Sequence, residues 1–190
     1  MSIVPPPAQA VLDFWFGSGG IRAEWFRKDP AFDAQIRERF GAWVDRAVAG
    51  ELADWQASPQ AALARIVLLD QFTRNIHRGS ARAFAGDALA LAAARAMVAS
   101  GQDAMLPPVP RAFVYMPFEH AEDLAAQNEA VRLFTALAAQ APELDENLDY
   151  ARRHRAIIER FGRFPHRNAA LGRPSTPEEA AFLQQPGSGF

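Results

Sequence analysis

The sequence predicts an all-α fold: one domain of antiparallel helical hairpins without a sheet. Apolar residues recur at three- and four-residue intervals, proline repeatedly follows a helix-capping residue, and no stretch shows the alternation of a strand. A chain of 190 residues, 49% apolar, can bury a core within one domain. We expect about eight helices in residues 8 to 183, with flexible segments at residues 1 to 7 and 185 to 190.

The first two helices are marked by their ends. AQAVLDFWFG predicts a short helix that closes at Gly17. Asp29 and Pro30 then combine an N-cap residue with a proline suited to the first helical turn, and the second helix runs to Gly50. Its apolar residues form one buried face. They are Phe32, Ile36, Phe40, Trp43, Val44 and Ala47.

Ser58 and Pro59 repeat this start signal, and the third helix continues through ALARIVLLDQFTRN. A fourth helix covers residues 85 to 100, with Gly101 as its C-terminal glycine. Its most apolar part, residues 88 to 99, is too short to span a bilayer.

The second half contains a proline-rich break, after which we expect RAFVYM to be a separate short piece ending at Pro117. A long helix should begin between residues 117 and 119 and continue to about Gln140. Another should cover residues 146 to 161. Thr176, followed by Pro-Glu-Glu, starts a last short helix.

Two boxes share the frame F-x-R-x-x-H-R. DQFTRNIHRG spans residues 70 to 79 and ERFGRFPHRN spans residues 159 to 168. Each occupies the last turn of a helix and the loop beyond it, where basic side chains oppose the negative end of the helix dipole. Helix capping is therefore one interpretation, and a shared site at one end of the helical array is the other.

Hairpin geometry predicts which acids face the boxes. If the last two long helices reverse near residue 143, Glu119 and His120 lie level with residues 163 to 167. The same reasoning places Arg74 near Asp87 or Asp33. Such convergence of titratable groups is how active sites and anion pockets are built.

We therefore predict a polar pocket for a small carboxylate or phosphate, in which histidine exchanges protons against a carboxylate and arginine holds the anion. The predicted proton-transfer residues are His77, His120, His166, Glu119 and Asp70. The predicted ligand-binding residues are Arg74, Asn75, Arg78, Arg163, Arg167 and Asn168. Whether the protein is an enzyme is left open.

Five motifs resemble a bacterial family, number 924 among the domains of unknown function. They are VLDFWFG, W-F-x-K-D-x-x-F-D, LLDQFTRNIHRG, F-x-Y-x-P-x-E-H-x-E-D and RFGRFPHRN with its trailing LGR. The resemblance covers residues 8 to 183 and implies a TPR-like helical fold, with no activity attached. It also supplies the alternative function, a TPR-type protein-interaction module whose boxes only cap helices, although no 34-residue repeat can be traced.

Composition and charge restrict the classes of partner molecule. A net charge of −2 does not favour nucleic acid or membrane lipid, so we expect a small anionic molecule or a protein as partner. The absence of cysteine excludes disulfides and thiolate metal sites, and with no signal-peptide pattern it favours a cytoplasmic protein.

A metal site is the remaining alternative. It would draw on His120, Asp123 and His166, with His154 or Glu122 as a further ligand. No strong signature such as H-E-x-x-H is present, and nearby arginines would repel a dication. We therefore expect no metal or other cofactor.

Overall fold

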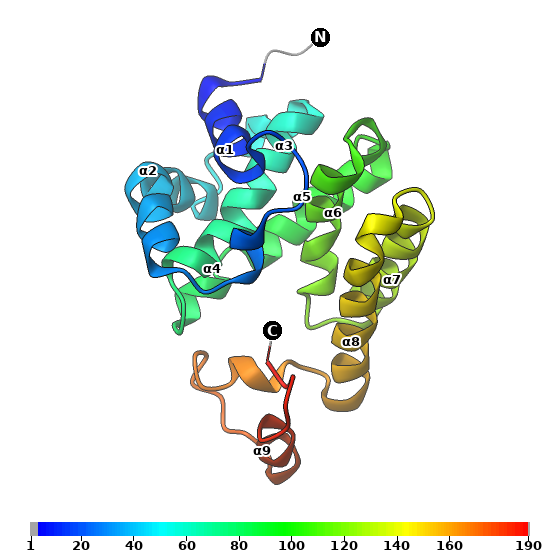
Figure 1. The fold of residues 1–190 in the computed structure, drawn as a ribbon. Coiled ribbons are helices and arrows are strands. Elements are labelled where there is room, and N and C mark those ends of the chain that lie inside the picture. Colours follow the sequence, from blue (N-terminus) through cyan, green and yellow to red (C-terminus); the bar gives the residue numbers. More distant parts are fainter. Residues whose placement is uncertain (1–3, 190) are drawn as a thin grey trace.

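The structure, a computed structural model, describes residues 4–189, and these contain helices and loops but no strand (Figure 1). The α-helices are α1 Pro6–Phe16, α2 Pro30–Val48, α3 Pro59–Ile66, α4 Thr73–Ile76, α5 Asp87–Ser100, α6 Pro108–Glu119, α7 Leu124–Ala138, α8 Asp145–Phe161 and α9 Pro177–Leu183. A π-helical segment, η3 (Val67–Phe72), joins α3 to α4 as one rod. The described chain therefore forms eight rods, which confirms the all-α prediction.

Most predicted helix starts are confirmed by their capping bonds. The Asp29 carboxylate accepts from the backbone N–H of Ala31 at 2.9 Å at the start of α2, and the Ser58 hydroxyl accepts from that of Ala61 at 3.3 Å at the start of α3. Helix α1 begins at Pro6, within the segment expected to be flexible. Residues 1–3 and 190, also expected to be flexible, lie outside the described residues.

The prediction of a separate RAFVYM piece is wrong. Helix α6 continues through Pro117 to Glu119, because a proline near the last turn removes only one backbone donor from the helix. The N–H of His120 still bonds the carbonyl of Met116 at 2.8 Å. Helix α7 starts only after Asp123, whose carboxylate accepts from Ala126 N at 2.7 Å. Glu119 and His120 therefore close one helix instead of opening the next.

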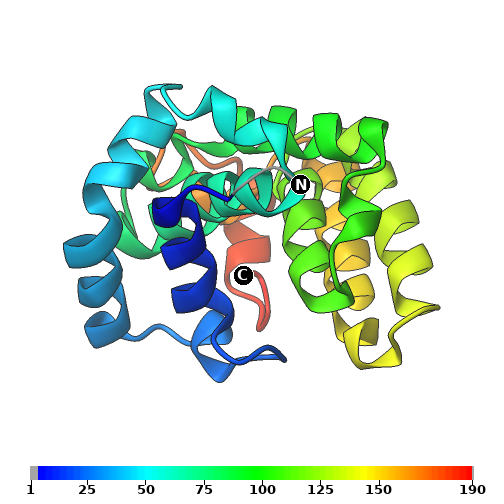
Figure 2. The ribbon, with the colours of Figure 1, turned by 90° about the horizontal axis from the view of Figure 1, so that it is seen from above.

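The remaining helices assemble as expected around reversing turns. Helices α7 and α8 pack against each other across a turn at Pro142–Leu144, and α6 packs on α7 (Figure 1). Seen from above, α1 and α2 lie on one side of the molecule and the yellow α7–α8 pair on the other (Figure 2). After α8, η7 (Pro165–Arg167) and α9 return beneath the helical array (Figure 1).

A close approach between the backbones of η3 and the start of α5 positions residues of the candidate site. A Cβ atom added to Gly86 would lie 2.2 Å from the carbonyl oxygen of Leu69, so only glycine allows the start of α5 to reach η3. This contact sets Asp87, the first residue of α5, beside Asp70 and Arg74 of the first box. π-Helical turns are frequent at functional sites, and this one carries Asp70.

One helical stretch, Ala81–Ser100, is long and apolar enough to cross a membrane by length and composition. The core helix of a soluble protein passes the same test. Within the fold this stretch contributes Ala90, Ala93, Ala94 and Met97 to the buried core.

Candidate functional site

The two boxes meet at Asp87. Arg74, from the first box, contacts both carboxylate oxygens of Asp87, with Nη1–Oδ1 at 2.9 Å and Nη2–Oδ2 at 3.1 Å. Arg167, from the second box, brings Nη1 to 3.3 Å from Oδ2 of the same carboxylate. Both guanidinium groups also lie near the ring of Phe84. The expected Arg74–Asp87 contact is confirmed, but the second box contributes Arg167 rather than Arg163, the frame counterpart of Arg74.

Asp70 and His120 form the central pair of this cluster. Nδ1 of His120 lies 2.8 Å and 3.0 Å from the two carboxylate oxygens of Asp70, which is 1% exposed. Gln71 donates to the same carboxylate at 2.6 Å, and Arg74 Nη1 lies 3.2 Å from it. Burial alone would raise the pKa of Asp70, but the charges of Arg74 and His120 hold it well below its usual range. The carboxylate is therefore ionised, and His120 Nδ1 carries the proton that is donated to it.

Arg167 ties the second box to this pair. Its Nη2 donates to the backbone carbonyl of His120 at 2.9 Å, which confirms the expected approach of His120 to residues 163–167. Burial, and then the positive charge of Arg74, lowers the pKa of Arg167 to about 10. Among the described residues, no hydrogen-bond acceptor contacts its buried Nε.

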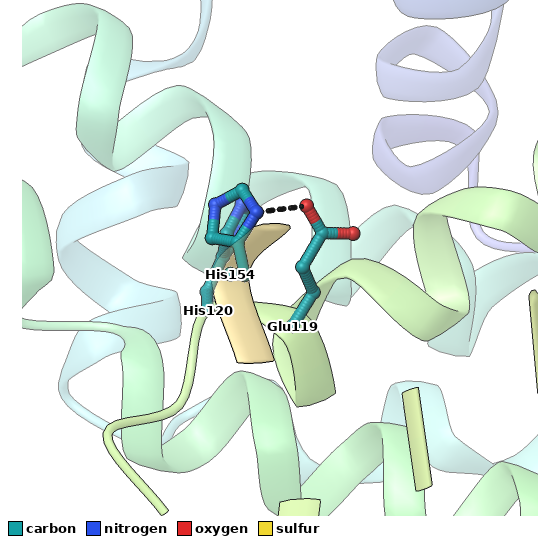
Figure 3. Close-up of side chains that lie close together, drawn as sticks. All are labelled: Glu119, His120 and His154. Carbon is teal, nitrogen blue, oxygen red and sulfur yellow. Dashed lines mark ion pairs between the residues drawn. The ribbon is translucent and has the colours of Figure 1, made fainter. Parts of the chain in front are cut away.

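A second carboxylate–imidazole pair lies next to the first. Oε1 of Glu119 is 2.9 Å from Nδ1 of His154, and both residues are buried (Figure 3). The same nitrogen lies 2.9 Å from the carbonyl oxygen of Tyr150. The rings of His120 and His154 have centroids 6.0 Å apart. Glu119, His120 and His154 offer ligand atoms that all lie within 4.8 Å of one another, so these three could hold a metal ion.

The rest of the first box faces elsewhere. Asn75 donates to Asp33 at 2.7 Å, and Arg78 makes a bidentate contact with the same carboxylate at 2.6 Å and 3.1 Å. These bonds hold α4 against α2. His77 ends α4, and its pKa is lowered, first by burial and then by the charge of Arg82.

In the second box, Arg163 and Asn168 bind Glu179 of α9. Arg163 Nε and Nη2 lie 2.6 Å and 2.8 Å from the two carboxylate oxygens, and Asn168 Nδ2 lies 3.3 Å from Oε2. Glu179 also forms a capping box with Thr176, where the sequence predicted a helix start. The Arg163 hydrogen bonds, together with the Thr176 backbone N–H, lower the pKa of Glu179 to about 2. These residues fasten α9 to the loop after α8.

The His166 ring lies next to that of Phe164, with the two ring centroids 5.5 Å apart. Burial, followed by the charge of Arg167, lowers its pKa to about 4, so the ring is neutral near pH 7. The boxes therefore come together only in part: Arg74 of the first and Arg167 of the second meet at Asp87, beside Asp70.

Three participants were not among the predicted proton-transfer and ligand-binding residues: Asp87, Gln71 and His154. The sequence held a signal for His154, which occupies the buried face of α8 together with Leu148, Ala151 and Ile158. A histidine on an otherwise apolar face requires a polar partner. Hairpin numbering had placed Asp87 opposite Arg74. For Gln71 there was no comparable pattern, since its contacts depend on how the rods pack.

Comparison with known proteins decides the family. The model of a family described as "Bacterial protein of unknown function (DUF924)" matches residues 11–187. The chain belongs to the DUF924 family. This confirms the resemblance inferred from the five motifs.

A solved structure is also similar to this DUF924 protein. It is a protein of unknown function from Agrobacterium tumefaciens, 42% identical, with a TM-score of 0.85 over 93% of this chain and 96% of the other. Among curated proteins, none matches. None of these names carries an activity, so function has to be inferred from the geometry of the site.

Proposed function

We propose that this DUF924 protein binds a small molecule with an anionic group where its two boxes meet, and that His120 exchanges a proton with it. The contact between His120 Nδ1 and the buried carboxylate of Asp70 carries the proposal. A carboxylate on Nδ1 fixes the tautomer and orientation of the ring and makes Nε2 the basic nitrogen. The His120 side chain is 17% exposed, against 1% for that of Asp70.

Charge and hydrogen bonding favour an anionic ligand. Asp70 and Asp87 are balanced by Arg74 and Arg167, so these two acids leave no net negative charge to repel an anion. Arg74 uses its donors on these two acids, whereas Nε of Arg167 is buried and contacts no acceptor in residues 4–189. A buried donor without a partner costs about 1–3 kcal/mol, a cost that a ligand oxygen would remove if Arg167 moved to expose Nε.

The proposed site contains fewer residues than the sequence predicted. Asn75 and Arg78 hold Asp33, and Arg163 and Asn168 hold Glu179. In this proposal these residues position helices α4 and α9. Nucleic acid and membranes are not proposed as partners, and a cytoplasmic location is part of the proposal.

Thermal-shift screening of a panel of small carboxylates and phosphates tests the proposal, because a ligand of the native state raises the melting temperature by mass action. We expect at least one panel member to stabilise the wild-type protein and to lose its effect in His120→Gln and Arg167→Gln. Arg78→Gln, outside the central cluster, is the control and should retain the shift. No shift with any panel member, or equal shifts in all variants, would contradict the proposal.

A protein-interaction module is the second candidate, favoured by an apolar groove of about 370 Å³ between α5, α6 and α7. Its lining residues are Val98, Ala99, Phe118, Ala125 and Ala126, with Arg95 and Glu129. The apolar face of a partner helix would suit such a groove. Val98→Asp should then abolish complex formation on size exclusion with a partner, while the anion-dependent thermal shift stays unchanged.

A further inference from the structure

His120 and His154 have the same hydrogen-bond pattern, because each directs its Nδ1 at an acceptor. His120 directs Nδ1 at the ionised carboxylate of Asp70. His154 directs Nδ1 at the Tyr150 carbonyl, which can only accept, so this nitrogen carries the N–H. In each neutral ring the lone pair therefore resides on Nε2. Histidines that bind metals almost always donate their other N–H to a carboxylate or a backbone carbonyl, as both do here.

Glu119 adds an anionic oxygen without an arginine beside it. It is 5% exposed, and its ion pair within the described residues is with His154. A buried carboxylate needs a cationic partner. His154 meets this need only when it is protonated, and a metal cation bound by Glu119 would meet it instead.

The sequence suggested that nearby arginines would repel a cation, but the structure pairs these arginines with acids. Each is paired with an acid outside this trio, so the surroundings sum to zero charge. These pairs are Arg74 and Arg167 with Asp87 and Asp70, and Arg173 with Glu122. The repulsion expected for a dication is therefore largely cancelled.

We propose that Glu119, His120 and His154 bind a divalent first-row transition metal ion such as Zn²⁺. Two imidazoles and a carboxylate suit such a metal better than Mg²⁺ or Ca²⁺, which take oxygen ligands. The ligand atoms lie within 4.8 Å of one another, whereas tetrahedral zinc brings them to roughly 3.3 Å. Glu119 and His120 lie at the end of α6 and next to the α6–α7 turn, where Glu119 would exchange its contact with His154 Nδ1 for the metal ion.

This inference goes beyond the proposed proton transfer and does not require it. Both use Nε2 of His120, so a proton and a metal ion compete for one lone pair. Three protein ligands leave a fourth position for water or for an anionic group. Metal binding and anion binding can thus be measured separately.

Untagged, chelator-treated protein titrated with Co²⁺, followed by its visible absorption and then by displacement with Zn²⁺, tests the site. We expect one equivalent per chain, at least 100-fold weaker binding in Glu119→Gln and His154→Gln, and unchanged binding in His77→Gln. Asp70→Asn should weaken binding 10–100-fold, because Asp70 only orients His120.

Two outcomes overturn the proposal: wild-type protein that binds no tighter than His154→Gln, or His77→Gln that loses as much affinity as His154→Gln. If the variants fail to fold by circular dichroism, the wild-type protein decides alone. Its affinity must rise between pH 5 and pH 7 as protons leave the histidines, and stoichiometric binding that is independent of pH would exclude histidine ligands. Absence of binding in the anion-responsive protein would remove the metal site and leave the proposed function standing.

Discussion

Nδ1 of His120 lies 2.8 Å from the carboxylate of Asp70, although 50 residues of sequence separate them. The contact joins the π-helical turn of the first box to the residue that ends α6. It is the point at which the proposed proton transfer and the proposed metal site both become possible, because it fixes which nitrogen of His120 is available.

Replacing Asp70 should change the acid stability of the protein. Its pKa is lowered in the folded state from about 3.9 in unfolded chains, so the native protein gains stability above about pH 4 and loses it as the pH falls further. Asp70→Asn should cost about 1–3 kcal/mol near pH 7, less than the 3–5 kcal/mol of an unpaired buried charge, since the amide still hydrogen-bonds. Urea unfolding from pH 7 to pH 2 should show this difference shrinking below pH 4, and a constant difference would contradict the assignment.

His166 should make the protein less stable in mild acid. Its folded pKa is about 4, against about 6.5 in unfolded chains, so protons bind the unfolded state preferentially as the pH falls from 6.5 to 4. The stability lost over that interval should be on the order of 1–3 kcal/mol, and His166→Gln should remove it. An NMR titration of the His166 ring checks the cause directly, since a pKa near 6.5 would show that burial does not disfavour the protonated ring.

Gly86→Ala should disturb the site through the backbone. The added Cβ would meet the carbonyl oxygen of Leu69 at 2.2 Å, so the start of α5 must move and carry Asp87 away from Arg74. We expect a loss of about 1–3 kcal/mol in the free energy of unfolding, together with weaker anion or metal binding. Gly41→Ala is the matched control, because nothing lies within 4 Å of its added Cβ and alanine favours helix α2. Equal effects of both substitutions on stability would rule out the steric explanation.

Arg163→Ala should release α9 without affecting the central cluster. Arg163 is bonded to Glu179 and to the Pro174 carbonyl, so its removal frees the chain that returns beneath α8. Amide hydrogen exchange in α9 should become faster. The loss of unfolding free energy in the double variant Arg163→Ala, Glu179→Gln should not exceed the sum of the losses in the two single variants. Unchanged exchange in α9, or loss of anion or metal binding, would instead assign Arg163 to the site.

Much of the architecture could be predicted from the sequence because it depends on local chemistry. The capping residues Asp29, Ser58 and Thr176 mark helix starts through bonds to residues two or three positions away. The approach of Arg74 to Asp87 followed from reversing the chain at a predicted turn. The helix boundary predicted at Pro117 was wrong. Proline lacks one backbone N–H donor, and a helix can lose that hydrogen bond near its end without breaking.

What only the tertiary structure decided is which acid each basic residue meets. Hairpin numbering places residues at the same level, but it does not say which neighbouring rod a side chain faces. The π-helical turn rotates the residues after Val67 relative to a regular helix, and the return of α9 gives Arg163 a partner that no hairpin predicts. The sequence by itself thus determined the helices, the two boxes and the level at which they meet. Packing of the rods decided that Asp70, His120, Glu119 and His154 come together in the candidate site, because side-chain contacts depend on rotation about each helix axis.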